Sequence, residues 1–581
     1  MEQTFVYTTV HPDDKLRNDK HKLIEWKGLF INSANHSKKK NRKFECKELI
    51  IDIDQPALEA SHCPDNYCIY KVPKRLRKVN NIAYTPRLVS IGPFHHRSEV
   101  LKDMDIQKLL ILKNFCVNND IKSIEVLKSI IRPKEEKIRS CYSETILLSS
   151  EGFLNMILLD AIFILELFRK KSEKDSRSSK ARKEDSESSK AHKEDSENSK
   201  AHEKDFENSK ADQIDYILSR PWLECGILHD LLLLENQLPF FVLEDLYQKG
   251  EPSKDKQSDL LKLSCSFFGD LIYYVYGSKP NSKTCGDRVK QPFIDGLVKY
   301  LYPEAPQKKV EIKHLTDLVR RFFYPPKTEG QKLNRCSTCL RKIKPSCCCS
   351  PGQEQEEENK RNNKHLRGTA TKLDEAGLKF TRPGSKTDLL QIQFPENECL
   401  ETFPCFNLSW LLSCLPCLKS NCLERRVQRC LEVPPLLLDD KTEGLFRNLM
   451  ALEQCHYPSE TYICDYIVLL DDLITTKEDV RFLVEKEIIV NELGSSAAVT
   501  KLINNLALEI EESGNPDYET LCEKVNDYYK SPWNRLVGIL TGTYFSDFFK
   551  GTATVVGIII LVLTLWNFQR LVRLSARKYY I

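Results

Sequence analysis

Cysteines with the spacing of metal ligands cluster in the second half of this chain. The sequence holds 22 cysteines, and half of them lie between Cys336 and Cys430. Two Cys-x-x-Cys pairs, Cys336 with Cys339 and Cys414 with Cys417, could supply four thiolates to a tetrahedral zinc ion. Roughly seventy residues separate the pairs, however, and a chelate that closes so long a polar loop is poor.

The same cluster contains three consecutive cysteines, Cys347, Cys348 and Cys349, close to Arg341 and Lys342. Thiols beside a basic patch are typical of reversible acylation sites, and acylation would bring this loop to a membrane surface. A loop without any ligand is the third interpretation. Zinc binding, acylation and a plain insert therefore stay open, and none of them is expected to define the core function.

Catalytic side chains are harder to find. The adjacent His95 and His96 could act as a general base, with Glu235, Asn236 and Gln237 as the other plausible polar cluster. Neighbouring side chains point apart, and no partner follows at a fixed spacing, so a structural or interface role is favoured. The sequence carries no dinucleotide loop, phosphate loop, nucleophile elbow or helical zinc-protease motif. We therefore predict no catalytic residue and no cofactor.

Paired carboxylates occur at Asp439-Asp440 and Asp471-Asp472, and such pairs can act as acid–base dyads or metal ligands. Helix caps and solvated turns are the favoured interpretation. Two patterns place an oxygen acceptor three residues ahead of a glutamate, as in a capping box: Asp440 with Glu443, and Thr475 with Glu478.

The elements that must position these residues are mainly helices. The chain of 581 residues has 87 basic and 83 acidic side chains, so its net charge of +4 gives no nucleic-acid footprint. The first residues lack the apolar core of a secretory signal. Isolated cysteines such as Cys116 and Cys265 lie in apolar contexts and indicate small buried side chains in a reducing compartment.

The last apolar stretch, Thr552 to Phe568, contains no charged residue and is followed by a basic tail. Its ten Val, Ile, Leu and Phe side chains contribute about −3 to −6 kcal/mol to membrane insertion. We predict a membrane span over 551–569, with these representative residues: Thr552, Val555, Ile558, Ile559, Leu561, Leu563, Trp566 and Phe568.

The position of this span favours insertion after synthesis, with the body left in the cytosol. The basic tail instead places the C-terminus in the cytosol by the positive-inside rule. We expect a cytosolic body, because moving some 550 residues across a membrane without a signal is the harder step. The membrane is either the plasma membrane or an endomembrane.

Composition shifts divide the chain. Three copies of a polar ten-residue repeat begin at Ser179, Ser189 and Ser199 and cannot bury enough surface to order themselves. The segment Leu389 to Phe394 alternates like a strand, and Leu431 to Leu438 is its expected hairpin partner. The expected units are a polar flexible segment (1–65), helical parts (66–170 and 213–329), a repeat insert (171–212), a Cys-rich charged insert (330–370), a helical lobe with the strand pair (371–550, insert 399–430), the span (551–569) and the basic tail (570–581).

Several long motifs, in this order, resemble the plant family called domain of unknown function 247, the UPF0481-type membrane proteins. The motifs are Val72 to Arg77, Ala83 to His96, Asp230 to Phe241, Thr442 to Cys455, Asp465 to Val480 and Val525 to Tyr529. The resemblance covers roughly residues 66 to 570. Three segments depart from the family pattern: the repeat, the Cys-rich segment and the insertion from Cys399 to Cys430. The last of these is consistent either with a true insertion or with a gene-model artefact such as a retained intron.

The resemblance implies a plant protein that is largely helical and carries one C-terminal membrane helix. It implies no reaction, while some grass members act as self-incompatibility determinants. We therefore expect a mainly α-helical body with a small β-hairpin, anchored to a membrane, that recognises or scaffolds an unidentified protein. Neither a nucleic acid nor a small-molecule substrate is predicted. An enzyme that uses His95 and His96, and a zinc or redox protein that uses the cysteine cluster, are the alternatives.

Overall fold

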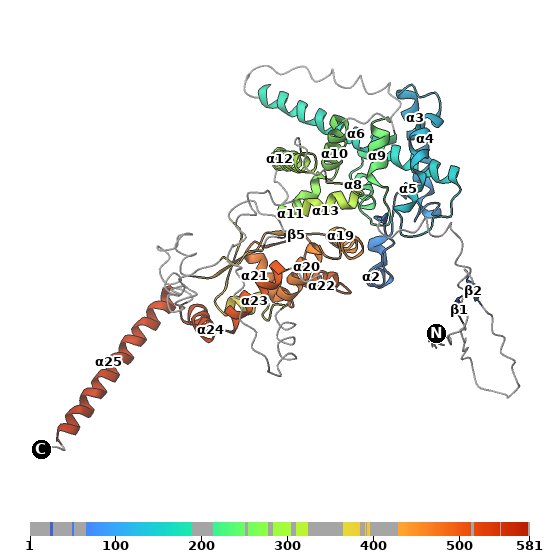
Figure 1. The fold of residues 1–581 in the computed structure, drawn as a ribbon. Coiled ribbons are helices and arrows are strands. Elements are labelled where there is room, and N and C mark those ends of the chain that lie inside the picture. Colours follow the sequence, from blue (N-terminus) through green and yellow to red (C-terminus); the bar gives the residue numbers. More distant parts are fainter. Residues whose placement is uncertain are drawn as a thin grey trace, which may run out of the picture. The chain divides into compact units, whose positions relative to one another are not determined.

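The computed structural model describes residues 24–26, 49–51, 66–188, 213–249, 254–276, 283–303, 310–323, 364–383, 390, 392–395, 428–512, 516–545 and 548–578 (Figure 1). The chain forms two compact units, residues 1–67 and 68–581. In the first unit, strands β1 (Ile24–Trp26) and β2 (Leu49–Ile51) pair antiparallel. Most of the predicted flexible segment 1–65 lies outside the described residues.

The first half of the second unit is helical, as predicted. Its elements are α2 (Lys74–Val79), η2 (Asn81–Tyr84), η3 (Glu99–Leu101), α3 (Lys102–Asn118), α4 (Ile124–Ile131), η4 (Arg132–Lys134), α5 (Glu135–Ser140), α6 (Ser150–Ser188), α7 (Gln213–Leu218), α8 (Pro221–Asp230), α9 (Phe240–Tyr247), α10 (Lys254–Phe267), η5 (Gly269–Leu271), α11 (Ile272–Tyr276), α12 (Lys283–Leu301) and α13 (Leu315–Phe323).

Helix α6 forms the centre of this half. Its side chains from Phe153 to Phe168 are largely buried, because α3, α4, α7, α9 and α10 all pack against it. In Figure 1 α6 runs through this group of helices. The apolar segment is therefore a core helix, as its interrupting polar residues predict.

The helix continues beyond the boundary that the sequence predicts. We expected the polar insert to begin at residue 171, whereas α6 extends to Ser188 and so includes the first repeat copy. Ion pairs one turn apart, Arg169 with Glu173 and Lys171 with Asp175, stabilise the first turn of this extension, because such pairs favour a solvated helix. The rest of the predicted insert, residues 189–212, lies outside the described residues, and the description resumes with α7.

The second half contains helices and two short parallel strand pairs. Its elements are α15 (Ala370–Glu375), β3 (Lys379–Thr381), β4 (Cys430–Glu432), β5 (Leu436–Leu438), α19 (Thr442–His456), α20 (Tyr462–Leu473), α21 (Lys477–Glu485), β6 (Ile489–Asn491), α22 (Ser496–Leu506), α23 (Pro516–Lys530), α24 (Pro532–Ile539), the π-turn η9 (Leu540–Tyr544) and α25 (Phe548–Lys578).

Strand pairing differs from the expected hairpin. β3 pairs in parallel with β4, and β5 pairs in parallel with β6, which lies about fifty residues further along the chain. Among their described residues, the predicted partners meet at one antiparallel bridge between Gln393 and Glu432, with N···O distances of 2.9 and 2.8 Å. The strands are too short to show their partners by sequence pattern alone.

The helix caps are displaced by one residue from the predicted boxes. At α19 the carboxylate of Asp439, not Asp440, accepts hydrogen bonds from the amides of Lys441 and Thr442 at 3.0 and 3.1 Å. Glu443 makes no capping box and instead accepts a hydrogen bond from Asn80 Nδ2. At α21 the box consists of Thr476 and Asp479, one position after Thr475 and Glu478.

Candidate functional site

The polar trio that the sequence singles out lies in the turn between α8 and α9. Glu235 is buried, and its carboxylate accepts a hydrogen bond from the Val72 amide at 2.7 Å. It also pairs with Arg77 at 2.5 Å, and His95 Nε2 lies 3.2 Å away without hydrogen-bond alignment. Burial raises the pKa of Glu235, but His95, Arg77 and the Val72 amide together lower the pKa below its ordinary value. The carboxylate is thus held ionised by structural partners.

The two amides of the trio bond to the backbone. Asn236 accepts from the Ile91 amide at 2.6 Å and donates to the Val89 carbonyl at 3.0 Å. Gln237 accepts from the Leu315 amide at 3.0 Å, at the start of α13. These contacts join three segments that are far apart in the sequence, so the amides satisfy buried backbone groups rather than face a substrate.

Two further buried carboxylates bind the backbone of segment 87–92. Asp230 accepts from the Val89 amide at 2.9 Å, and Asp160 accepts from the Gly92 amide at 2.8 Å. Lys108 on α3 pairs with Asp160 at 2.6 Å, and both side chains are buried. Segment 87–92 is thereby fixed against α3, α6 and the α8–α9 turn.

The two histidines differ in their surroundings. His95 faces Glu235, whereas burial lowers the pKa of His96 and keeps that imidazole neutral at pH 7. The trio and His95 therefore converge, as the enzyme alternative requires, but they converge on backbone amides and an arginine. This arrangement has the geometry of a structural cross-link and leaves no ionisable side chain of the trio available for proton transfer.

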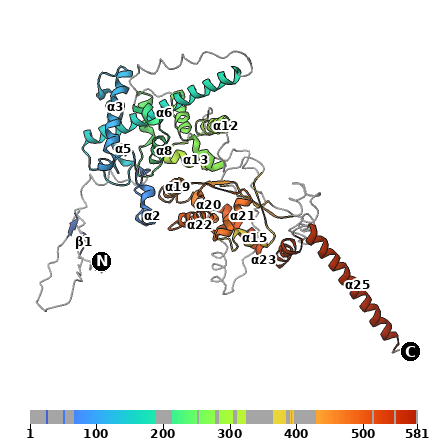
Figure 2. The same ribbon diagram turned by 180° about the vertical axis from the view of Figure 1, so that it is seen from behind.

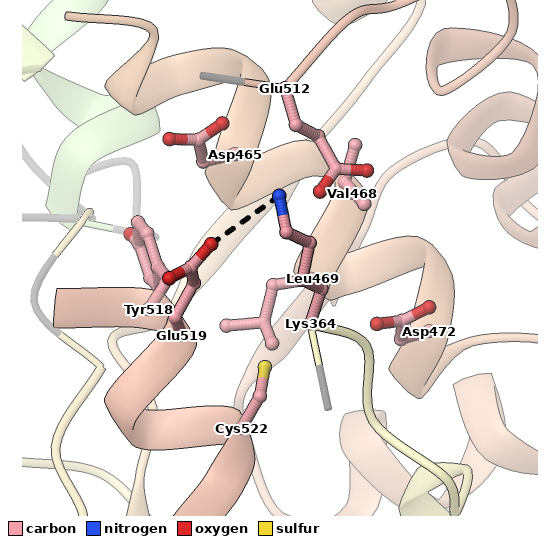
Figure 3. A pocket seen from close by; sticks show the side chains of 9 residues that line it. All are labelled: Lys364, Asp465, Val468, Leu469, Asp472, Glu512, Tyr518, Glu519 and Cys522. Atoms are coloured by element: carbon pink, nitrogen blue, oxygen red, sulfur yellow. Dashed lines mark ion pairs between the residues drawn. The ribbon is translucent and has the colours of Figure 1, made fainter. Parts of the chain in front are cut away.

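A small pocket lies in the second half, between α20 and α23 (Figure 3). Lys364 extends into it and pairs with Glu519 at 3.5 Å, while Asp472 approaches His365 at 3.3 Å. The cavity volume is about 20 Å³, which accommodates about one water molecule. A substrate of ordinary size does not fit, so the charged groups serve to pair one another.

A different feature has the character of an interaction surface. On α3, Ile106, Leu109, Leu110 and Val117 are exposed by 56, 57, 38 and 69%. Their spacing puts them on one face of the helix, opposite the face that packs on α6. We call these four residues the α3 stripe. It exposes an area on the order of 300 Å², similar to the largest apolar patch on a typical monomer.

The charges around the α3 stripe have mixed signs. Lys102, Asp103 and Lys113 are exposed on the same side of the helix. A surface that binds anionic lipid would be predominantly basic. An apolar stripe with a mixed polar rim instead has the composition of a protein-binding surface. Figure 2 shows α3 at the edge of its half, with α6 beside it.

The structure describes only some of the site residues predicted in the second half of the chain. The cysteines proposed for zinc and acylation lie outside the described residues: Cys336, Cys339, Cys347, Cys348, Cys349, Cys414 and Cys417. The predicted span lies in α25, where the 25-residue segment Phe549–Arg573 contains an 18-residue stretch of mean hydropathy 1.9 that is 6% buried. At about 1.5 Å per residue this helix is long enough for a hydrocarbon core of about 30 Å. Trp566 and Phe568 are exposed on it.

The sequence did not single out the α3 stripe. Helix α3 also has buried apolar residues, among them Met104, Ile111 and Leu112. With apolar side chains on both faces, its periodicity does not separate core from surface. The i, i+3, i+4 spacing of Ile106, Leu109 and Leu110 indicates a second apolar face on this helix. Only the packing of α6 against α3 shows which of the two faces is exposed.

The fold and its sites define a helical protein with a terminal apolar helix and no recognisable catalytic centre among the described residues. A family model for plant proteins of unknown function, DUF247, matches residues 69–563, so the chain belongs to this family. A UPF0481 protein of Arabidopsis thaliana is 27% identical over 506 residues, which cover 86% of this chain and 85% of the relative. A second Arabidopsis UPF0481 protein is 22% identical over 544 residues, with 85 and 88% covered. No solved structure matches this chain.

Proposed function

We propose that this chain is a membrane-anchored recognition protein whose body binds another protein through the α3 stripe. The observation that carries the proposal is the apolar face of α3, which is exposed although the opposite face is firmly packed. The apolar length of α25 supports anchoring by one C-terminal span. The body lies in the cytosol in this proposal, at the plasma membrane or an endomembrane.

The stripe suits an apolar helical or sheet surface on the partner. Exposed leucine and isoleucine at i, i+3 and i+4 are the anchors used when helices pack face to face or enter grooves. Lys102 and Asp103 would then form a polar rim that fixes the orientation, while Lys113 lies within the stripe between Leu110 and Val117.

The test compares two double variants of the full chain in plant membranes. Ile106→Glu with Leu109→Glu places charges in the α3 stripe, and the control, Val484→Glu with Leu508→Glu, changes exposed apolar residues elsewhere. A proximity-labelling enzyme at the N-terminus marks neighbouring proteins. We expect the first variant to lose its marked partner at least about tenfold, a difference of about 1.4 kcal/mol, and the control to keep it. Equal marking by both variants would exclude the α3 stripe as the recognition surface.

Topology is tested separately with glycosylation-acceptor tags after Ile581 and at the N-terminus, read by size shift in plant microsomes. A modified C-terminal tag means that the body lies in the cytosol. A modified N-terminal tag would overturn that part of the proposal and place recognition outside the cytosol.

The alternatives have less support. The enzyme that would use His95 and His96 requires a free polar cluster, whereas Glu235, Asn236 and Gln237 bond to backbone amides and Arg77. Zinc binding by the cysteine pairs lies outside the described residues and stays a prediction, which a zinc-to-protein ratio in purified material would decide.

A further inference from the structure

Two cysteines lie side by side where the second unit begins. The Ile69 amide donates to the Cys141 carbonyl at 2.9 Å, and the Ser143 amide donates to the Ile69 carbonyl at 3.0 Å. This is the pattern of a parallel bridge, which joins Ile69 to Tyr142. The residues that precede each partner, Cys68 and Cys141, are therefore neighbours on the same side of the bridge.

The two thiols are close enough to influence each other's ionisation. Each thiol shifts the pKa of the other, raising the pKa of Cys68 and lowering the pKa of Cys141, so Cys141 is the thiol that ionises first. In the structure the Cys141 thiol donates to the Lys137 carbonyl at 3.2 Å. The ammonium groups of Lys137 and Lys313 also favour the Cys141 thiolate, whereas Glu311 opposes it. Both cysteines are buried and unbridged in the structure.

We propose that Cys68 and Cys141 form a thiol–disulfide exchange site that takes a small disulfide, of the glutathione disulfide class, and closes into an internal disulfide. The adjacency of two thiols across one bridge carries this proposal, since cross-linking needs side chains that already approach each other. It is independent of the α3 stripe and of the membrane topology.

The exchange proceeds in two steps. The Cys141 thiolate attacks one sulfur of glutathione disulfide, breaking its S–S bond and releasing one glutathione thiolate. Cys68 then loses its proton to solvent, and its sulfur attacks Cys141 to expel the second glutathione thiolate. The two protein thiols lose two electrons in total, and the small disulfide gains them as it becomes two thiols.

The cross-link would fix the start of the second unit. Cys68 is the first residue of that unit, and its carbonyl already accepts a hydrogen bond from His314 Nε2 at 3.0 Å. The bond closes the loop between residues 68 and 141, which restricts the unfolded chain and stabilises the folded one. Oxidation is therefore expected to raise the midpoint of thermal unfolding by several degrees.

The first experiment uses the full chain purified in detergent under reducing conditions. It is exposed to excess glutathione disulfide, quenched with acid, alkylated after denaturation and digested without reductant. Mass spectrometry should detect a peptide pair linked through Cys68 and Cys141 that disappears on reduction. Cys265, which is buried with no cysteine among the groups that affect its pKa, should remain alkylatable. Recovery of Cys68 and Cys141 as free thiols, or as separate glutathione adducts, would overturn the proposal.

Matched variants separate the cross-link from general oxidation. Cys265→Ser should keep both the linked peptide and the oxidation-dependent rise of the unfolding midpoint. Cys141→Ser should lose both. If oxidation raises the midpoint of Cys141→Ser as much as that of the unchanged protein, the stabilisation does not come from this pair. The peptide mapping needs no variant, so the proposal can be tested even if Cys141→Ser folds poorly.

Discussion

At the scale of single residues, a buried ionisable group is held in one protonation state when its partners require that state. His314 is an example, because one ring nitrogen donates a hydrogen bond and the other accepts one. His314 Nε2 donates to the Cys68 carbonyl, and Nδ1 accepts from the Asp317 amide at 3.3 Å. Both contacts require the neutral imidazole, and burial lowers the pKa of His314 to about 4. His365 is the opposite case, because the hydrogen bond to Asp472 raises its pKa.

These shifts predict opposite dependences of stability on pH. Since the pKa of His314 is lowered from 6.5 to about 4, the unfolded chain binds a proton that the folded chain excludes. Stability from His314 is complete above pH 6.5 and falls as pH drops towards 4, by about 3 kcal/mol. Replacing His314→Gln should flatten this fall in urea unfolding series.

His365→Gln is the matched control. The raised pKa of His365 means that its contribution is complete below pH 6.5 and is lost as pH rises through the higher pKa of the folded state. This variant should therefore lose stability mainly at low pH. The same pH slope in both variants and in the unchanged protein would contradict the assignment of His314 as a buried neutral imidazole.

A buried ion pair allows a second prediction at this scale. Glu453 pairs with Arg320 at 3.0 Å, both side chains are fully buried, and Glu453 also accepts from the Cys464 amide. Burial raises the pKa of Glu453 to about 7, so the carboxyl is ionised at pH 8. At that pH, Glu453→Gln removes the buried counter-charge of the guanidinium and leaves, among the described residues, only the half-exposed Glu460 carboxylate at 4.0 Å. The free energy of unfolding should fall by about 3–5 kcal/mol.

Chemical unfolding measures this change, and exposed Glu478→Gln serves as the control with an expected change within about 0.5 kcal/mol. A similarly small effect at position 453 would mean that the glutamate is protonated even at pH 8.

At the scale of elements, close backbone packing fixes the segment that precedes α25. A Cβ at Gly538 in α24 would lie 2.2 Å from the Glu375 carbonyl oxygen and 2.6 Å from the Gly377 nitrogen. Backbone atoms at the end of α15 cannot move aside cheaply, so Gly538→Ala should destabilise the protein by about 3 kcal/mol. Gly444→Ala in α19 is the control, because no atom lies within 4 Å of its added methyl group.

We expect the control to be neutral or to stabilise α19 by up to about 1 kcal/mol, since alanine favours helix. Unfolding in urea measures both variants. Equal stabilities would show that α24 does not pack on α15 as closely as described.

The elements also show how far the sequence leads. The core segment of α6 and the apolar length of α25 were predicted, because each is long and strongly patterned. The pairing of β5 with β6 was not, since two three-residue strands in different parts of the chain carry no local sign of their partner. The predicted cap was one position late at α19 and one position early at α21, because Asp439-Asp440 and Thr475-Thr476 each offer two adjacent acceptors and only the backbone shows which one is aligned.

The candidate site was partly visible for a similar reason. Glu235, Asn236 and Gln237 could be named as a polar cluster, but their partners lie some eighty to 160 residues away in the chain. Sequence alone does not distinguish a buried cross-link from a binding site. The α3 stripe required the opposite information, namely which of two apolar faces remains uncovered.

At the scale of the whole molecule, α25 is expected to decide where the protein resides. Ile559→Arg with Leu563→Arg puts two charges in the middle of the apolar helix, at about 2.5–3.5 kcal/mol each, which outweighs the favourable insertion term. In flotation of microsomes after cell-free synthesis, this variant should leave the membrane fraction. Phe568→Arg should remain there, because a charge close to Arg570 can reach the interface.

Retention of the double-arginine variant in floated membranes after alkaline extraction would contradict a span. Loss of the Phe568→Arg variant as well would place the centre of the inserted segment nearer the C-terminus.

The long-range hydrogen bonds have a consequence for synthesis. Asn448 Nδ2 donates to the Ala83 carbonyl at 2.8 Å, a separation of 365 residues, and Asn80 donates to Glu443 across 363 residues. At about 5–20 residues per second, the ribosome makes the second partner roughly 20 to 70 s after the first. During that interval the early segment has no α19 on which to close, so nascent chains are exposed to chaperones and proteases. Helix α25 begins about ninety residues after α19 ends, so the ribosome makes it roughly 5 to 20 s later, and the body can begin to close before the apolar helix is complete.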